Sequence, residues 1–284
     1  MLATRLKADL ALLLAAIVWG GGFVAQRSAS AYLGAFAVNG LRFTLGTIVL
    51  LPLIRFHLKI TREQFPWMIL LGGAVFAGSA LQQAGLAITS AANSGFITGL
   101  YVVIVPILLV LFGRQRLSWK TWISALVATI GIFLLSFQGT LETNPGDMLV
   151  LAGAVAWAIH LIVLGKLAHQ MDILQLSIGQ FLIAGVLNLA AGAIFELDTF
   201  GGIILAWPAI IYAGICSTAI GFSLQAIGQR NSHPADAAIL LSMEAVFAAL
   251  FGYLLLNERL SGVQIFGCTL ILGSILLAQL NGNK

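Results

Sequence analysis

Charged side chains are scarce in this chain. Only 8% of its 284 residues are Asp, Glu, Lys or Arg, whereas 60% are hydrophobic. A soluble domain carries roughly 25% charged residues, because water must solvate its surface. The composition therefore excludes a water-soluble fold. The apolar runs reach about 20 residues each, the length that a membrane-spanning helix needs, and they indicate an integral membrane protein.

Cysteine is nearly absent as well. Cys216 and Cys268 both lie within apolar runs, so the sequence indicates neither a disulfide framework nor a metal site. It also contains no nucleotide-binding loop and no catalytic triad, which argues against an enzyme and against a pump that hydrolyses ATP. We expect no metal and no cofactor. The net charge of +4 reflects loop Lys and Arg residues rather than a nucleic-acid surface.

Ten hydrophobic segments follow one another with short polar turns between them. The first five lie near residues 8–27, 33–54, 66–88, 91–113 and 118–138, and the second five near 146–168, 173–195, 203–228, 233–256 and 262–281. The sequence thus predicts an all-α membrane protein of ten transmembrane helices.

The basic residues fall unevenly on the two sides of these helices. If the N-terminus is inside, the inner segments hold eleven of them: Arg5, Lys7, Arg55, Lys59, Arg62, Arg114, Arg116, Lys120, Lys166, Arg230 and Lys284. The outer loops hold two, Arg27 and Arg259. Because Lys and Arg are enriched in cytoplasmic loops, we expect a multi-pass protein of the cell inner membrane with both termini in the cytoplasm.

The chain also repeats itself. The segment LAAIVW at Leu14–Trp19 resembles AGAVAW at Ala152–Trp157, and the tripeptide Arg-Leu-Ser at 116–118 recurs at 259–261. The matches keep the same order in both halves, which is the signature of an internal repeat.

Each half holds five predicted spans, an odd number, so the second half must enter the membrane upside down relative to the first. We place these inverted repeats at residues 1–140 and 141–284. Inverted repeats enclose a substrate site near the middle of the bilayer, and rocking of one repeat against the other opens that site to each side in turn.

Four segments in this order resemble a known family. They are IVWGGGFVAQ at Ile17–Gln26, AVNGLRF at Ala37–Phe43, SAANSGFITGLYVVIVPILL at Ser90–Leu109, and MEAVFAALFGYLLLNERLS at Met243–Ser261. Together they make the chain similar to the EamA-type ten-helix permeases of the drug/metabolite transporter superfamily, over almost its whole length.

The resemblance implies two inverted five-helix repeats around a central cavity and transport by alternating access. Bacterial proteins of this kind include amino-acid exporters of the YddG type, so we expect a secondary transporter that exports amino acids or similar small metabolites. Nucleotide sugars or other phosphate-bearing metabolites are the alternative cargo, because a fold alone does not fix a function. A facilitative channel is the other alternative. The expected partners are a small molecule and the lipid bilayer, and a monomer and a homodimer are equally open.

Aromatic residues supply the first candidates for the cavity. Trp19 and Trp157 occupy matching positions of the repeats and lie near mid-helix, where an indole N–H needs a protein partner or a hydrated cavity. They either pack between helices or form the cavity wall, and the resemblance favours Trp157 for the wall. Tyr101 precedes Pro106 by five residues, and a proline-bent helix at this depth often borders a transport site.

Ionisable residues supply the second group. His160 follows Trp157 by three residues and shares its helical face, while Glu244 lies in the middle of the ninth span. A buried carboxylate needs a partner, a proton or water. Both residues are therefore candidates for the cavity and for proton coupling, although His160 could equally be a neutral imidazole bonded to a neighbouring carbonyl.

Amides and one arginine complete the set. Gln83 and Gln225 occupy corresponding positions of the two repeats, so they either line opposite mouths of the cavity or bond helices together. Arg42 lies in the second span, and we expect its long side chain to reach the membrane interface rather than the cavity.

Overall fold

The computed structural model describes residues 2–86, 88, 91–137, 145–256 and 259–279, all in helices and short connections. The helices form ten successive segments, which we call rods; some rods contain more than one helix. The first five are α1 (Leu2–Ala29), α2 (Ala35–Leu50) with the 3-10 turn η1 (Leu51–Ile54), α3 (Phe65–Leu86), α4 (Ala91–Gly99) followed by α5 (Tyr101–Leu111), and α6 (Trp119–Ser136). Lys284, and the ends of the predicted spans at residues 138 and 281, lie outside the described residues.

The second five rods repeat this order. They are α7 (Pro145–Ala168), α8 (Ile173–Phe195), a composite of η2 (Leu197–Gly202), α9 (Ile203–Ile211), the π-helical segment η3 (Tyr212–Phe222) and α10 (Ser223–Gln229), then α11 (Pro234–Leu241) followed by α12 (Met243–Leu256), and finally α13 (Gly262–Gln279). Within the described ranges, nine rods are long and apolar enough to cross a membrane, and the shorter helix Gly262–Ala278 is the tenth apolar rod. The predicted ten-helix architecture is confirmed.

The fifth rods of the two halves show that the repeats are inverted. Gly131 lies near the end of α6 and Gly267 near the start of α13, yet a Cβ added to either glycine would lie within 2.8 Å of the other's carbonyl oxygen. In the same region Gln264 Nε2 donates to the Leu135 carbonyl at 3.1 Å. The end of α6 therefore meets the beginning of α13, and these equivalent helices run antiparallel.

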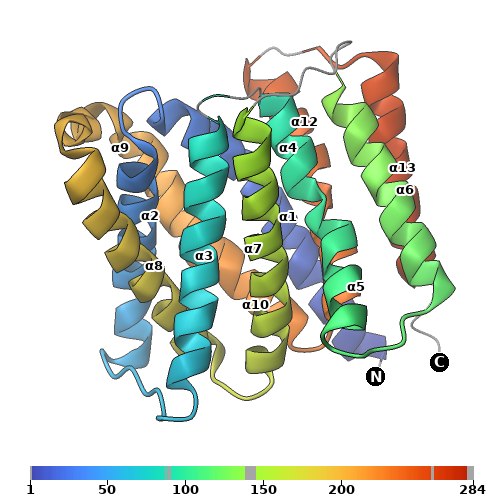
Figure 1. The fold of residues 1–284 in the computed structure, drawn as a ribbon, viewed down its shortest axis with the longest axis horizontal. Coiled ribbons are helices and arrows are strands. Elements are labelled where there is room, and N and C mark those ends of the chain that lie inside the picture. Colours follow the sequence, from blue (N-terminus) through green and yellow to red (C-terminus); the bar gives the residue numbers. More distant parts are fainter. Residues whose placement is uncertain (1, 87, 89–90, 138–144, 257–258, 280–284) are drawn as a thin grey trace.

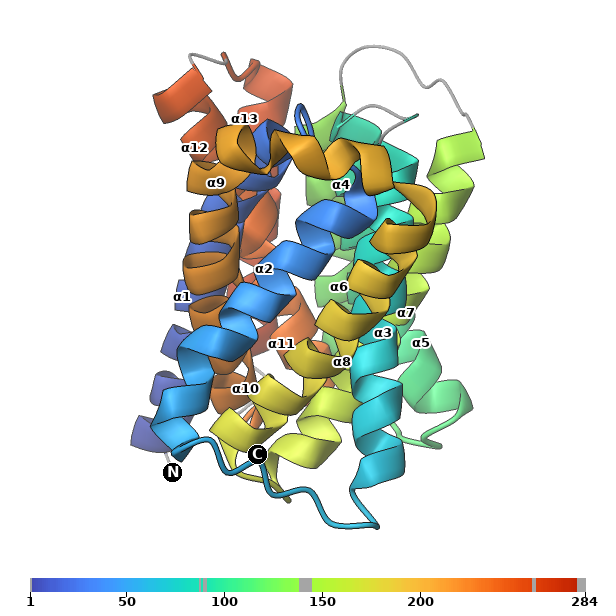
Figure 2. The ribbon, with the colours of Figure 1, turned by 90° about the vertical axis from the view of Figure 1, so that its left-hand side faces the viewer.

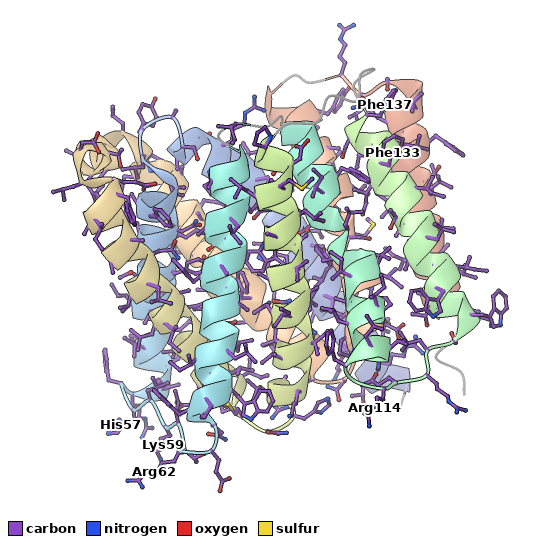
Figure 3. The ribbon with its side chains drawn as sticks, in the orientation of Figure 1. His57, Lys59, Arg62, Arg114, Phe133 and Phe137 are labelled. Carbon is purple, nitrogen blue, oxygen red and sulfur yellow. The ribbon has the colours of Figure 1, made fainter. Side chains whose placement is uncertain are left out.

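The ribbon shows the same inversion for the whole bundle. In Figure 1, α1 rises from the lower edge, where the N-terminus lies, whereas α7, its counterpart, begins at the upper edge. His57, Lys59, Arg62 and Arg114 lie along the lower edge in Figure 3. We call these two ends of the bundle the lower edge and the upper edge.

Helices of the two halves interleave. Figure 2 shows α2 crossing one face of the bundle obliquely beside α8, and α3 packs along α7 while α1 packs along α12. A Cβ added to Gly40 of α2 would lie 2.7 Å from the Leu189 side chain of α8. Small residues allow such close approach between helices in a membrane, so the centre of the bundle is enclosed by both repeats.

Each of the two fourth rods contains a one-residue turn at mid-depth. The first turn is at Leu100, between α4 and α5, and its equivalent is at Ser242, between α11 and α12; both residues keep right-handed helical backbone angles. Pro106 itself stands inside α5, six residues after the turn at Leu100. Tyr101 and Glu244 lie just after the two turns.

The contact between α6 and α13 generates a test of helix packing. A Cβ on Gly267 would lie 2.6 Å from the Gly131 carbonyl oxygen and 2.7 Å from the Leu135 backbone nitrogen, whereas a Cβ on Gly273 of the same helix meets no heavy atom within 4 Å. We expect Gly267→Ala to lower the free energy of unfolding by about 1–3 kcal/mol, as overpacking does. Gly273→Ala is the matched control and should unfold at the wild-type temperature in detergent. Equal melting temperatures for the two variants would contradict this packing.

Candidate functional site

A cavity lies at the centre of the bundle and is lined by helices of both halves. Its lining contains six of the residues predicted from the sequence: Trp19, Tyr101, Trp157, His160, Gln225 and Glu244. The seventh, Gln83, is buried outside this lining and donates from Nε2 to Ser30 Oγ at 2.6 Å. Its neighbour Gln82 lines the cavity instead.

The cavity reaches toward the upper edge. Gln26 lies three residues before the upper end of α1, and Gln82 lies near the upper end of α3, where its Nε2 donates to Thr98 Oγ1 at 3.0 Å. At the other end, Leu161 and Gln225 belong to the lining and are almost fully buried. Polar side chains therefore line the part of the cavity nearer the upper edge.

Helices pack closely below the cavity. Gln229 Nε2 donates to the Leu161 carbonyl at 2.9 Å, which fastens α10 to α7. A Cβ added to Gly228 would lie 2.5 Å from the Leu12 side chain and 2.9 Å from the Ala8 carbonyl oxygen, so α10 also lies directly against α1.

Phe222 is the centre of an aromatic wall along this cavity. Its ring centroid lies 4.9 Å from that of Trp19, 6.1 Å from Trp157, 5.7 Å from His160 and 5.6 Å from Phe181. The edge-on arrangement of most of these pairs is the favoured one for aromatic rings. Phe222 was not predicted from the sequence, because nothing in its apolar run distinguishes it from the other phenylalanines.

The two tryptophans differ in their partners. Trp19 Nε1 donates to the Ser217 carbonyl at 2.9 Å, and Ser217 belongs to the π-helical segment, where the regular backbone bonding of an α-helix is altered. Trp157 packs its indole on Gly78 of α3, where an added Cβ would lie 2.8 Å from the ring. Trp19 therefore joins α1 to η3 and also lines the cavity.

Tyr101 and Glu244 connect the two fourth rods. Tyr101 Oη donates to Glu244 Oε1 at 3.0 Å, so the first residue after one turn holds a carboxylate just after the other. Discontinuous helices at mid-membrane commonly carry transport sites, because their ends expose polar groups to a cavity. The sequence predicted both residues but did not pair them.

His160 has a different partner. Its Nε2 lies 2.8 Å from Gln180 Oε1, and both side chains are buried. The sequence offered the backbone as the alternative partner of His160, whereas the structure supplies a glutamine of α8. His160 and Glu244 thus line one cavity with separate partners.

The expectation from the sequence was wrong for Arg42. Its side chain does not extend to the membrane interface: it is 4% exposed and belongs to the cavity lining. Its Nε donates to Asn39 Oδ1 at 3.0 Å, and its guanidinium lies 4.4 Å from the centroid of the Phe43 ring. In the part of the chain that the structure describes, no carboxylate lies within ion-pair distance of Arg42. The cavity therefore holds one cation and one acid, Glu244.

Comparison with known proteins gives the family of the chain. The model of the EamA-like transporter family matches twice, at residues 6–137 and 144–280. An uncharacterized transporter of Archaeoglobus fulgidus is 31% identical over 276 residues, which cover 97% of this chain and 87% of the relative. The threonine/homoserine exporter RhtA of Escherichia coli K12 is 27% identical over 272 residues, covering 92% of this chain and 85% of that protein.

A protein of known crystal structure superposes with a TM-score of 0.83 at 22% identity, over 96% of both chains, and so has the same fold. The family matches extend over both halves, and the cavity lies where those halves meet. The chain accordingly belongs to the EamA-like transporter family: it is a multi-pass membrane protein and a secondary transporter of a small molecule, not an enzyme.

Proposed function

We propose that this transporter exports amino acids or similar small polar metabolites by alternating access. The observation that carries the proposal is the central cavity, which both inverted halves line with aromatic, polar and charged side chains. The similarity to RhtA, whose name describes a threonine/homoserine exporter, supports amino acids as the cargo.

In this proposal the two halves, residues 1–140 and 141–284, rock against each other around the cavity. The one-residue turns at Leu100 and Ser242 and the π-helical segment at Tyr212–Phe222 lie beside the cavity. Such irregular segments adjust their backbone bonding more readily than continuous α-helix does. Opening of the lower edge would require the contact between Gln229 and the Leu161 carbonyl to break.

The alternatives fit these features less well. A channel needs a pore that is continuous from edge to edge, whereas α10 packs directly against α1 and α7 below the cavity. A phosphate-bearing cargo has Arg42 as a cation partner, but it would also face the carboxylate of Glu244.

The proposed activity can be measured with purified protein in liposomes. Vesicles loaded with unlabelled threonine or homoserine should take up the labelled amino acid faster than protein-free vesicles, and the uptake should saturate. A panel of nucleotide sugars and sugar phosphates tests the alternative cargo in the same vesicles. Uptake of a phosphate-bearing compound with none for any amino acid would contradict the proposal.

We also propose that Glu244 carries a proton that couples transport to the pH gradient. A gradient of one pH unit holds about 1.4 kcal/mol, enough for about a tenfold concentration gradient of cargo when one proton exchanges for each molecule. Glu244→Gln retains the size of the side chain but cannot ionise, so an imposed pH gradient should no longer accelerate its transport. Glu63→Gln, on an exposed loop, is the matched control and should respond like the wild type.

The outcome of that experiment assigns the proton to a residue. If Glu244→Gln still responds fully to the gradient while His160→Gln does not, His160 is the proton carrier. A full response in both variants would exclude proton coupling through either side chain.

The orientation in the inner membrane is a further part of the proposal. The lower edge carries His57, Lys59, Arg62 and Arg114 (Figure 3), and basic residues concentrate on the cytoplasmic side. Both termini would then be cytoplasmic. With Cys216 and Cys268 replaced by alanine, a cysteine at position 62 should resist a membrane-impermeant thiol reagent added to intact cells.

A cysteine at position 198, beside the upper edge, should react with the same reagent. The opposite pattern of labelling would reverse the orientation.

A further inference from the structure

The charge of Arg42 is not neutralised inside the cavity. An arginine side chain stays protonated in proteins and has five N–H donors. Only Nε–H is used, by Asn39 Oδ1, and no other described residue accepts a hydrogen bond from the guanidinium. Both described neighbours, the Asn39 amide and the Phe43 ring, are neutral. A buried cation without a counter-ion is unfavourable, so this guanidinium is suited to receive an anionic group of the cargo.

The acceptors of the cavity lie on the other half of the protein. Arg42 is on α2 of the first half, whereas Glu244 is on α12 and Gln225 on α10 of the second. Glu244 uses Oε1 to accept from Tyr101, and its Oε2 accepts from no residue in the described ranges. Gln225 Oε1 is buried with no hydrogen-bond partner among the described residues. Glu244 Oε2 therefore offers an acceptor to a cargo that has donors, and Gln225 belongs to the same lining.

These observations place a cation on one half and acceptors on the other, around a single cavity. We propose that the cargo is a zwitterion that bridges the two halves, with its carboxylate on Arg42 and its ammonium group on Glu244, assisted by Gln225. An α-amino acid has this chemistry. The inference rests on the proposed amino-acid transport and adds the residues that read the two charges.

The balance of charge determines which cargoes fit. Arg42 and Glu244 sum to zero, so a cargo of zero net charge leaves the filled cavity neutral. A phosphate monoester has about two negative charges near neutral pH and would leave a net negative charge in a membrane interior. A simple amine would leave Arg42 without a partner. A carboxylate matches the fork of a guanidinium, because two parallel N–H groups can bond its two oxygens.

The test combines altered cargo with altered protein. Threonine is compared with threoninamide, which lacks the carboxylate, and with N-acetylthreonine, which lacks the ammonium group. Apparent dissociation constants come from ligand-dependent thermal stabilisation of the protein in detergent, and half-saturation values come from exchange in liposomes. In the wild type, each analogue should bind at least about tenfold more weakly than threonine, as expected for the loss of a charge-assisted hydrogen bond.

The variants should then show a crossed pattern. Arg42→Gln should weaken threonine binding by at least about tenfold but change threoninamide binding little, because the amide has no carboxylate to lose. Glu244→Gln should weaken threonine binding similarly but change N-acetylthreonine binding little. Arg62→Gln and Glu63→Gln, on an exposed loop, are matched controls and should bind all three compounds like the wild type.

The other outcomes would contradict either the zwitterion inference or the proposed function. If the wild type exchanges threonine but binds the two analogues equally well, the zwitterion inference is wrong and amino-acid transport stands. The zwitterion inference is also wrong if Arg42→Gln weakens the binding of threonine and of threoninamide by equal factors. The wild-type comparison of cargoes decides the inference even if a variant fails to fold. If no amino acid binds or is exchanged, both the inference and the proposed function are wrong.

Discussion

Hydrocarbon offers no hydrogen-bond partner, so every polar side chain in the membrane interior must find one within the protein or in water. In this chain those partners are found by bringing polar groups from both halves to one place. Tyr101 meets Glu244, His160 meets Gln180, and Trp19 meets the Ser217 carbonyl. Tyr101, Glu244, His160 and Trp19 from these pairs all line the cavity.

Inverted repetition explains why this place lies at mid-depth between the halves. A segment that appears twice with opposite orientation puts equivalent features at the same level of the membrane. Both fourth rods contain a one-residue turn there, at Leu100 and Ser242, and the residues that follow the turns bond to each other. The fifth rods cross through Gly131 and Gly267. The same inversion makes two opposite states of comparable structure available, which alternating access requires.

The sequence was sufficient for features set by length and periodicity. Ten rods and their inversion follow from apolar runs and an odd number of spans, and Trp19 and Trp157 were found through the repeat. What depends on the rotation of a helix about its axis was not predictable from one sequence. Arg42 turns inward, because α2 packs against α8 and η3. Gln82 replaces Gln83 in the lining because of the way α3 packs against α7 and α8. The turns also lie away from Pro106, since packing helps to decide where a helix yields.

The central claim is that one cavity, shared by the inverted halves, opens to each side of the membrane in turn. Ser217→Cys, in a background with Cys216 and Cys268 replaced by alanine, puts a thiol in the cavity lining with little change of size. A membrane-impermeant thiol reagent should reach this cysteine from either side of oriented vesicles, and bound cargo should protect it from both. Reaction from one side only, whatever the cargo and pH, would contradict the account.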